Sequence, residues 1–313
     1  MANPSSELIL HHYDTSPFSE KVRKVLAHKG VPWRAVEQPP IMPKPDLVPL
    51  TGGYRRIPVL QVGADVYCDT QLIVRVLERL HPTPSIYPHG EAGTEGTCHV
   101  WNLWADRLLF LAVVPLVFAE IGQFMPKEFI ADRTKMVPGR DFGAMGQLAP
   151  AAREQARALI ATIDAQLAGD ESFLLGDNFS LADAACYHPL WFLRLAPEAS
   201  ALTRELPRVA AWMDRVHAMG EGQRSPLGAS EALEIARQAT PAAPAPSDPH
   251  EPNGLVPGMR VSIVPDDYAF DPVVGELTHA SVHEVSVKRI DPKLGEIAVH
   301  FPRIGFRVVA EGA

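Results

Sequence analysis

Cysteine is scarce in this chain, and so are long apolar runs. The three cysteines, Cys68, Cys98 and Cys186, are an odd number without a Cys-x-x-Cys pair, which argues against a disulfide framework and a thiolate zinc site. A reducing compartment fits best, so we expect a cytoplasmic protein. The longest apolar run, Leu108 to Phe118, is far shorter than the roughly 20 residues that a bilayer requires. No basic stretch followed by an apolar one opens the sequence, and we expect neither an export signal nor a membrane span.

An excess of basic charge is also missing. The 313 residues include 29 Lys and Arg against 37 Asp and Glu, a formal net charge of -8. Nothing global therefore draws the chain to nucleic acid or to anionic lipid, and we expect no nucleic acid and no membrane as partners. With 46% hydrophobic and 21% charged residues the composition is that of a folded globular protein, long enough for two or three domains.

Proline is the one residue in excess, and its distribution divides the chain. Six of the 30 prolines lie between Thr240 and Pro257, which predicts an extended linker at 240–257. Residues 1–82 predict alternating elements, with strands at 8–10, 33–37, 57–62 and 66–67 and helices at 17–29 and 69–80.

The rest of the chain changes character twice. Residues 94–239 predict an all-helical domain with helices at 94–122, 149–167, 181–195, 207–219 and 230–239, and a loop or broken helix at 124–150. Residues 258–313 predict a small closed or half-closed β-barrel with strands at 259–264, 273–277, 282–290, 296–301 and 306–309. The last unit carries six basic and eight acidic residues, so we expect it to contact protein rather than RNA.

The most informative motif lies between the first strand and the first helix. Ser16 occupies the expected N-cap position and Pro17 the first helical position, a pairing that favours a helix start. An N-cap is a sufficient reason for this serine. A hydroxyl at a helix N-terminus, however, also faces free N–H groups and the positive end of the helix dipole, which stabilise an anion such as a thiolate.

Two further sites are compatible with the same ligand. Pro58 begins a strand, and a cis Ile57-Pro58 bond there leaves the preceding backbone groups free to pair with an extended ligand. Asp69 and Thr70 begin the third helix, where N–H groups can hold a carboxylate and Asp69 an ammonium; ordinary helix capping is the alternative.

Together, SPFSEKVR at 16–23, IPVL at 57–60, DTQLI at 69–73 and GDNFSLAD at 176–183 resemble the cytosolic glutathione S-transferase family, in its Ser/Cys branch, over residues 7 to about 239. The resemblance implies an α+β fold: a thioredoxin-like N-terminal domain, then an all-α domain, with the Src-homology-type β-barrel as an addition. It implies a transferase that activates the glutathione thiol for attack on a small electrophile, as in detoxification. It also implies a homodimer.

The resemblance carries over to single residues. Ser16 aligns with the catalytic hydroxyl or thiol, with Tyr13 as the competing hydroxyl near the end of the first strand. Glutathione would be bound by Ser16, Phe18, Arg56, Ile57, Pro58, Asp69 and Thr70. Arg56 would pair with the glycyl carboxylate, or else be solvated at the surface. Ser180 and Asp183 match a structural capping box.

The electrophile pocket is expected at Tyr13, Trp104, Leu108 and Leu111, although such an apolar stripe is often only core. Ser16 and Ser19 stand where related proteins carry a Cys-Pro-x-Cys pair, and a hydroxyl cannot form a mixed disulfide, so thiol–disulfide exchange is disfavoured. No His, Asp or Glu cluster has metal-ligand spacing, and we expect no metal. The alternative function is a weakly catalytic, transferase-like scaffold whose tail barrel recruits a protein.

Overall fold

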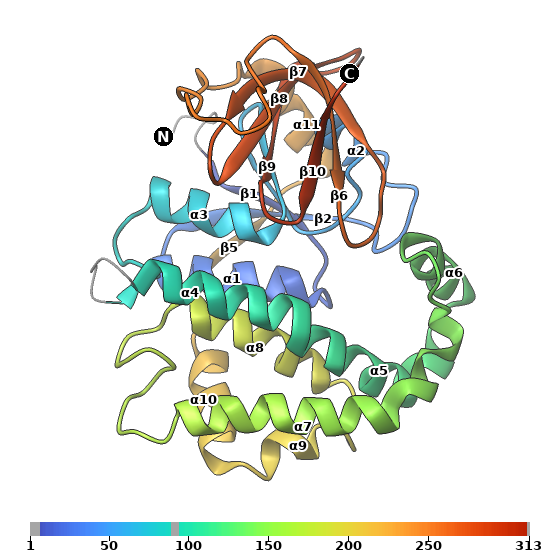
Figure 1. Cartoon of the computed structure of the whole chain (residues 1–313), viewed down its shortest axis with the longest axis vertical. Helices are drawn as coiled ribbons and strands as arrows, with labels where there is room; N and C mark the ends of the chain where they lie inside the picture. Colours follow the sequence, from blue (N-terminus) through green and yellow to red (C-terminus); the bar gives the residue numbers. More distant parts are fainter. Residues whose placement is uncertain (1–6, 89–93, 312–313) are drawn as a thin grey trace.

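The computed structural model describes residues 7–88 and 94–311, in three parts that pack together (Figure 1). The expectation about an export signal concerns residues 1–6, which lie outside these ranges. The N-terminal domain is thioredoxin-like, as the sequence predicts. Its elements are β1 (Ile9–His12), α1 (Pro17–Lys29), β2 (Pro32–Glu37), α2 (Val48–Thr51), β3 (Val59–Val62), β4 (Asp65–Cys68) and α3 (Thr70–Leu80). β1 pairs in parallel with β2 and antiparallel with β3, and β4 is antiparallel to β3.

Local signals fix the ends of α1. Ser16 caps its start by accepting a hydrogen bond from the backbone N–H of Ser19, and Pro17 supplies the first helical residue. Gly30 ends the helix at φ +64°, a left-handed conformation that glycine adopts without steric cost. The start of α1 is therefore held in a fixed orientation just after β1.

The second part is the all-helical domain. It contains α4 (Thr94–Trp104), a π-helical turn η3 (Ala105–Leu109), α5 (Phe110–Ile121), α7 (Ala149–Gln166), α8 (Leu181–Leu193), α9 (Ala201–Arg204) and α10 (Pro207–Ala218). The last helix, α11 (Ala229–Gln238), was expected in this domain but lies on the sheet instead, where Ala232 packs in one cluster with Ile9 of β1 and Val36 of β2 (Figure 1). The segment expected to be a loop or broken helix forms the 3-10 turn η4 (Gly122–Phe124), α6 (Lys127–Met136) and the 3-10 stretch η5 (Phe142–Leu148). By length and composition alone, the continuous helix Thr94–Phe124 is apolar enough to cross a membrane. Its inner face packs in the main core through Cys98, Leu109 and Val113, which marks a core helix.

The capping box is confirmed at the start of α8. The buried carboxylate of Asp183 accepts hydrogen bonds from the backbone N–H and the hydroxyl of Ser180, from the N–H of Leu174 and from the indole of Trp212. Four donors satisfy one buried anion, which joins α8 to the preceding loop and to α10.

The tail is the strand-rich third part, with β6 (Arg260–Pro265), β7 (Val273–Ala280), β8 (Glu284–Asp291), β9 (Gly295–Pro302) and β10 (Phe306–Ala310). Its sheet continues that of the N-terminal domain, because β9 pairs in parallel with β4 through Val66 and Val299. Together with β5 (Gln223–Pro226), which pairs with β2, the strands form one sheet of ten in the order β10-β6-β7-β8-β9-β4-β3-β1-β2-β5. The edge strand of the thioredoxin-like domain is thus covered by the chain's own tail.

The tail and the N-terminal domain also share a hydrophobic core. Leu50, Val59 and Val66 from the N-terminal domain pack in one cluster with Phe301 and Phe306 from the tail. The segment 240–257 is irregular, as a linker should be, yet it is bonded along its length. Ala242 donates to Asp65, Asp248 to the carbonyl of Ala280, and His279 contacts the carbonyl of Ala245. It acts as a strap along the tail rather than as a free spacer.

Candidate functional site

Strand pairing brings the residues singled out in the sequence to the same end of strands β1, β3 and β4. His11 in β1 pairs with Val59 in β3, and Val59 pairs with Cys68 in β4. Three segments therefore lie at this end of the strands: the loop that carries Ser16, the Ile57-Pro58 bond and the Asp69-Thr70 pair. The Ile57-Pro58 peptide is cis.

Ser16 is 2% exposed and lies at the N-terminus of α1. Its Oγ uses a lone pair to accept from the N–H of Ser19 at 3.2 Å, so its own O–H remains available as a donor. The Oγ of Ser19 is buried and finds no hydrogen-bond partner among the described residues. The Ser16 hydroxyl thus lies at the positive end of a helix dipole.

Asp69 caps α3 and adopts a sparsely populated conformation. Its φ is +71°, unusual for a residue with a side chain, and its carboxylate accepts from the N–H of Gln71 at 2.9 Å. A strained conformation of this kind persists only where the surrounding structure holds it, and such residues cluster at functional sites. Burial raises the pKa of Asp69, while Arg56 and Lys21 oppose that rise. Thr70, at the first position of the helix, is buried.

Arg56 is not solvated, and that alternative for it is wrong. Only 8% of the residue is exposed, and its Nη2 donates to Asp267 and to the carbonyl of Tyr268, both in the tail. The ring of Tyr268 stacks on the guanidinium with its centroid 3.6 Å away. The partners come from the tail domain, which the sequence analysis treated as separate.

A buried ion pair crosses the interface between the two transferase domains. Lys21 of α1 donates to Asp106 at 2.7 Å and to Asn102 at 3.0 Å. Burial would raise the pKa of Asp106, but Lys21 and a hydrogen bond from His188 lower it, so the carboxylate is ionised. Burial lowers the pKa of His188 to about 4, and the neutral ring donates through Nε2. The sequence analysis missed this group, whose partners are more than 80 residues apart.

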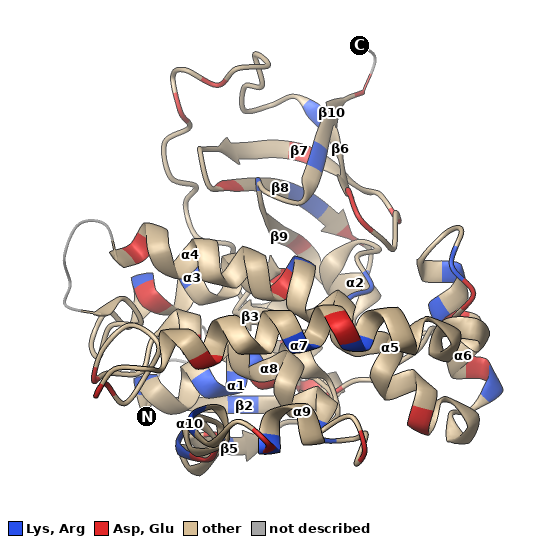
Figure 2. Cartoon of the chain, turned by 60° about the horizontal axis from the view of Figure 1, so that its bottom comes forward, with Lys and Arg blue, Asp and Glu red and all other residues tan. Residues whose placement is uncertain are grey.

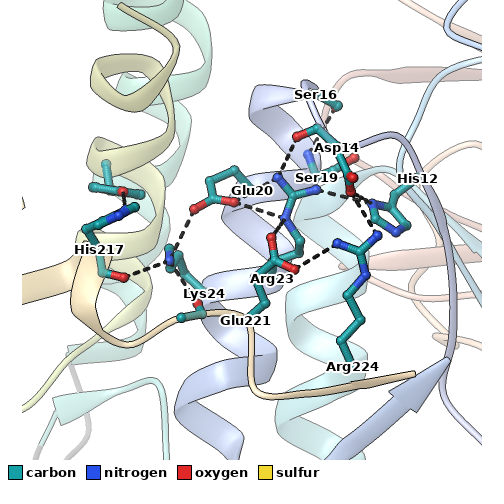
Figure 3. Close-up of polar contacts among 12 residues, drawn as sticks. His12, Asp14, Ser16, Ser19, Glu20, Arg23, Lys24, His217, Glu221 and Arg224 are labelled. Atoms are coloured by element: carbon teal, nitrogen blue, oxygen red, sulfur yellow. Dashed lines mark hydrogen bonds and ion pairs between the residues drawn. The ribbon is translucent and has the colours of Figure 1, made fainter. Parts of the chain in front are cut away.

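A second network of polar side chains lies beside α1 (Figure 3). Arg23 reaches Glu20, the backbone carbonyl of Asp14 and the ring of His12, whose Nδ1 lies 3.1 Å from its Nη1. Burial and the nearby Arg23 lower the pKa of His12 to about 3. His12, Asp14 and Glu37 place potential metal ligands within 4.8 Å of one another, a grouping that sequence spacing did not reveal.

Two arginines already neutralise that grouping. Arg23 contacts His12, and Arg224 pairs with Asp14 at 2.9 Å. The cluster is therefore a charge network beside α1, and a cation would have to compete with two guanidinium groups for the same atoms.

The remaining predicted residues lie in different surroundings. Phe18 packs at the domain interface, with its ring centroid 4.8 Å from those of Phe110 and His188. Trp104 packs edge-on against Trp101, while Leu108 and Leu111 are 54% and 45% exposed. These placements leave the electrophile pocket at Tyr13, Trp104, Leu108 and Leu111 a prediction. Cys68 is buried, and burial raises the pKa of its thiol well above the usual value, which makes it unreactive.

Lys44 is a further residue that the sequence analysis missed. It is buried in the loop before α2, where its ammonium donates to the carbonyl of Arg55 at 2.9 Å. Burial, together with Arg133 and Arg55, lowers its pKa to about 7. Only the fold brings these three basic groups together, since Lys44 and Arg55 lie in loops and Arg133 lies in α6.

Known proteins share this architecture. The family models for the N-terminal and C-terminal domains of glutathione S-transferase match residues 10–85 and 146–215. The structure of a GST-like protein from Pseudomonas syringae is 41% identical, covers 98% of this chain and all of its own, and superposes with a TM-score of 0.81. The match therefore extends into the tail.

More distant relatives match a smaller share of the chain. A probable glutathione S-transferase of Solanum tuberosum is 24% identical over 203 residues, 64% of this chain and 81% of its own. A glutathione S-transferase of Methylobacterium radiotolerans, solved in complex with glutathione sulfonate, is 21% identical over 70% of this chain and 96% of its own, with a TM-score of 0.53. Fold, capping box and whole-length similarity agree, and the chain belongs to the glutathione S-transferase family.

Proposed function

We propose that the protein binds glutathione at the end of strands β1, β3 and β4 that carries Ser16, Ile57 and Asp69, and that it activates the glutathione thiol for attack on a small electrophile. The observation that carries the proposal is Ser16 itself, a buried hydroxyl with a free proton at a helix N-terminus. Asp69 would hold the ammonium of the γ-glutamyl unit, beside Thr70. The named ligand of the Methylobacterium radiotolerans relative supports this choice.

The chemistry asked of the chain is modest. A free thiol with a pKa of about 8.5 is only a few per cent thiolate at neutral pH, and each unit of depression takes about 1.4 kcal/mol of differential stabilisation. The Ser16 hydroxyl donates to the sulfur and the dipole of α1 adds to the field. The thiolate then attacks an electrophilic carbon and displaces its leaving group. Assembly as a homodimer, location in the cytoplasm and the identity of the electrophile stay predictions.

The test is a calorimetric titration of the full-length protein with glutathione. We expect a dissociation constant between micromolar and low millimolar, and an ultraviolet thiolate band that appears on binding near neutral pH. The matched variant Asp69→Asn keeps the shape of the cap and removes its charge, so it should weaken binding roughly tenfold. Binding without a thiolate band would favour the alternative, a transferase-like scaffold.

A further inference from the structure

One loop of the tail lies on the arginine that was expected to bind the ligand's glycyl carboxylate. The loop, residues 266–272, joins β6 to β7, and Asp267 accepts a hydrogen bond from Nη2 of Arg56 at 2.5 Å. The carbonyl of Tyr268 accepts from the same nitrogen, and the Tyr268 ring covers the guanidinium face. A carboxylate and a carbonyl thus occupy Nη2 of Arg56 and an aromatic ring covers the guanidinium, while the buried Nε finds no hydrogen-bond partner among the described residues.

The loop is fixed from three directions. In the tail, the N–H of Asp266 donates to the carbonyl of Gly305 at 2.9 Å. From the helical domain, Arg107 pairs with Asp266 and with Asp267, at 3.2 Å each. The N–H of Ala269 donates to the carbonyl of Met136 at the end of α6, at 2.7 Å. Figure 1 shows the tail above the N-terminal domain, with α6 at the same side as β6.

The backbone of the loop shows that this position is specified. Ala269 has φ +49°, in the left-handed region that residues with a side chain disfavour. Such a conformation persists only where its surroundings determine it, and here Ala269 is buried and bonded to Met136. The loop is therefore held in place over Arg56.

The arrangement has a direct electrostatic consequence. A ligand carboxylate that approaches Arg56 competes with the carboxylate of Asp267, which already makes a charge-assisted contact with its Nη2. Figure 2 shows acidic residues on the segment that follows β6, beside the N-terminal domain. The gain from the ligand's own carboxylate is offset by the loss of the internal pair.

We propose that Asp267 stands in for a ligand carboxylate on Arg56, so that the β6–β7 loop makes the site select thiol ligands by their γ-glutamyl-cysteinyl part and not by a C-terminal carboxylate. Asp267 and Tyr268 are then specificity-determining residues supplied by the tail. The proposal rests on the proposed glutathione site. It gives the tail a role in the transferase site itself.

The test compares two thiols on the full-length protein by calorimetry. The first is glutathione, and the second is its monoethyl ester at the glycyl carboxylate, which removes that one charge. The unaltered protein should bind both with dissociation constants within about threefold. Asp267→Asn frees Arg56 and should tighten glutathione roughly tenfold while leaving the ester unchanged, since a charge-assisted hydrogen bond is gained only by the free acid.

Asp266→Asn is the matched control. It removes the same charge from the adjacent residue, which pairs with Arg107 and not with Arg56. Because Asp267 keeps its own pair with Arg107, the loop should stay in place and both affinities should be unchanged. Arg56→Gln added to Asp267→Asn should abolish the gain, because the guanidinium is the group set free.

Two results would overturn the competition alone. One is an unaltered protein that binds the ester tenfold more weakly than glutathione. The other is an equal gain in Asp266→Asn and Asp267→Asn, which would reflect general charge rather than Arg56. If no variant binds either thiol, the proposed function itself fails, and the competition with it.

Discussion

At the scale of single residues, Ser16 has two tasks that can be separated. It caps α1 through a lone pair and is proposed to donate its proton to the ligand sulfur. Ser16→Ala should raise the pKa of the bound thiol by about one to two units, which corresponds to about 1.4–2.7 kcal/mol of lost thiolate stabilisation. A spectroscopic titration of bound glutathione measures this shift.

Tyr13→Phe is the control, since it removes the competing hydroxyl from the end of the first strand. Loss of the cap in Ser16→Ala should also cost about 1 kcal/mol of stability, visible in the free energy of unfolding without ligand. An unchanged thiol pKa in Ser16→Ala together with a shift in Tyr13→Phe would transfer the catalytic assignment to Tyr13.

The sequence predicted those residues whose role depends on their neighbours in the chain. Ser16 and Asp69 were identified because capping is a local property, and the structure places both at helix starts. Arg56 could not be read this way, because its partner Asp267 is 211 residues away. For the same reason the sequence did not predict the group formed by Lys21, Asp106 and His188.

At the scale of secondary structure elements, the junction between β4 and β9 joins the tail to the transferase body. His300 of β9 lies between two carboxylates, Asp65 of β4 at 3.0 Å and Glu284 of β8 at 2.8 Å. Its ring stacks on Tyr67 of β4 with the centroids 4.4 Å apart. Burial lowers the pKa of His300, but the two carboxylates outweigh it and raise the pKa above 6.5.

The sign of the pH dependence follows from that raised pKa. The folded state holds the proton more tightly than the unfolded state, so the stabilisation is complete below about pH 6.5 and is lost as the pH rises through the folded pKa. His300→Gln keeps a polar side chain without a titrating charge. Its loss of stability should therefore be larger at pH 6 than at pH 9.

Denaturant unfolding of both proteins at the two pH values measures this difference. His250, on an exposed turn of the strap, offers a matched control, and His250→Gln should give equal values at both pH values. A loss in His300→Gln that does not change with pH would mean that the ring acts by stacking on Tyr67 alone.

Element prediction succeeded where the period was clear. The N-terminal strands and helices, the long helices and the five tail strands follow the expected ranges to within a few residues. The segment 124–150, expected as a loop or broken helix, contains α6, whose bounds its glycines and prolines did not indicate. That helix is stabilised by packing of Phe129 and Ile130 beside Met145. β5 was missed because Gln223–Pro226 is a polar edge strand defined only by its partner β2.

At the scale of the whole molecule, the chain differs from a body with a loosely tethered tail. The prolines of 240–257 indicated separate folding units, whereas the structure has one ten-stranded sheet and a shared core. Hydrophobic pattern identifies which face of a strand is buried but not which distant strand buries it. The partner of β4 therefore lay beyond what periodicity can predict.

Removal of residues after Gln238 tests this architecture. Truncation would expose the edge of β4 and the apolar side chains of Leu50, Val59 and Val66, which the tail buries. Each buried aliphatic side chain contributes about 1.5–3 kcal/mol, so three of them amount to on the order of 5 kcal/mol, comparable with the net stability of a domain. We expect the truncated protein to unfold at a markedly lower temperature and to associate through the open β4 edge, as unpaired strand edges do. Calorimetry and light scattering at micromolar concentration measure both effects, with Asp266→Asn as a full-length control that should match the unaltered chain. The same light-scattering measurement on the full-length protein tests the expected homodimer, which would have to form away from the covered β4 edge.

A truncated chain that keeps both the melting temperature and the particle size of the full-length protein would show that the tail is an independent unit.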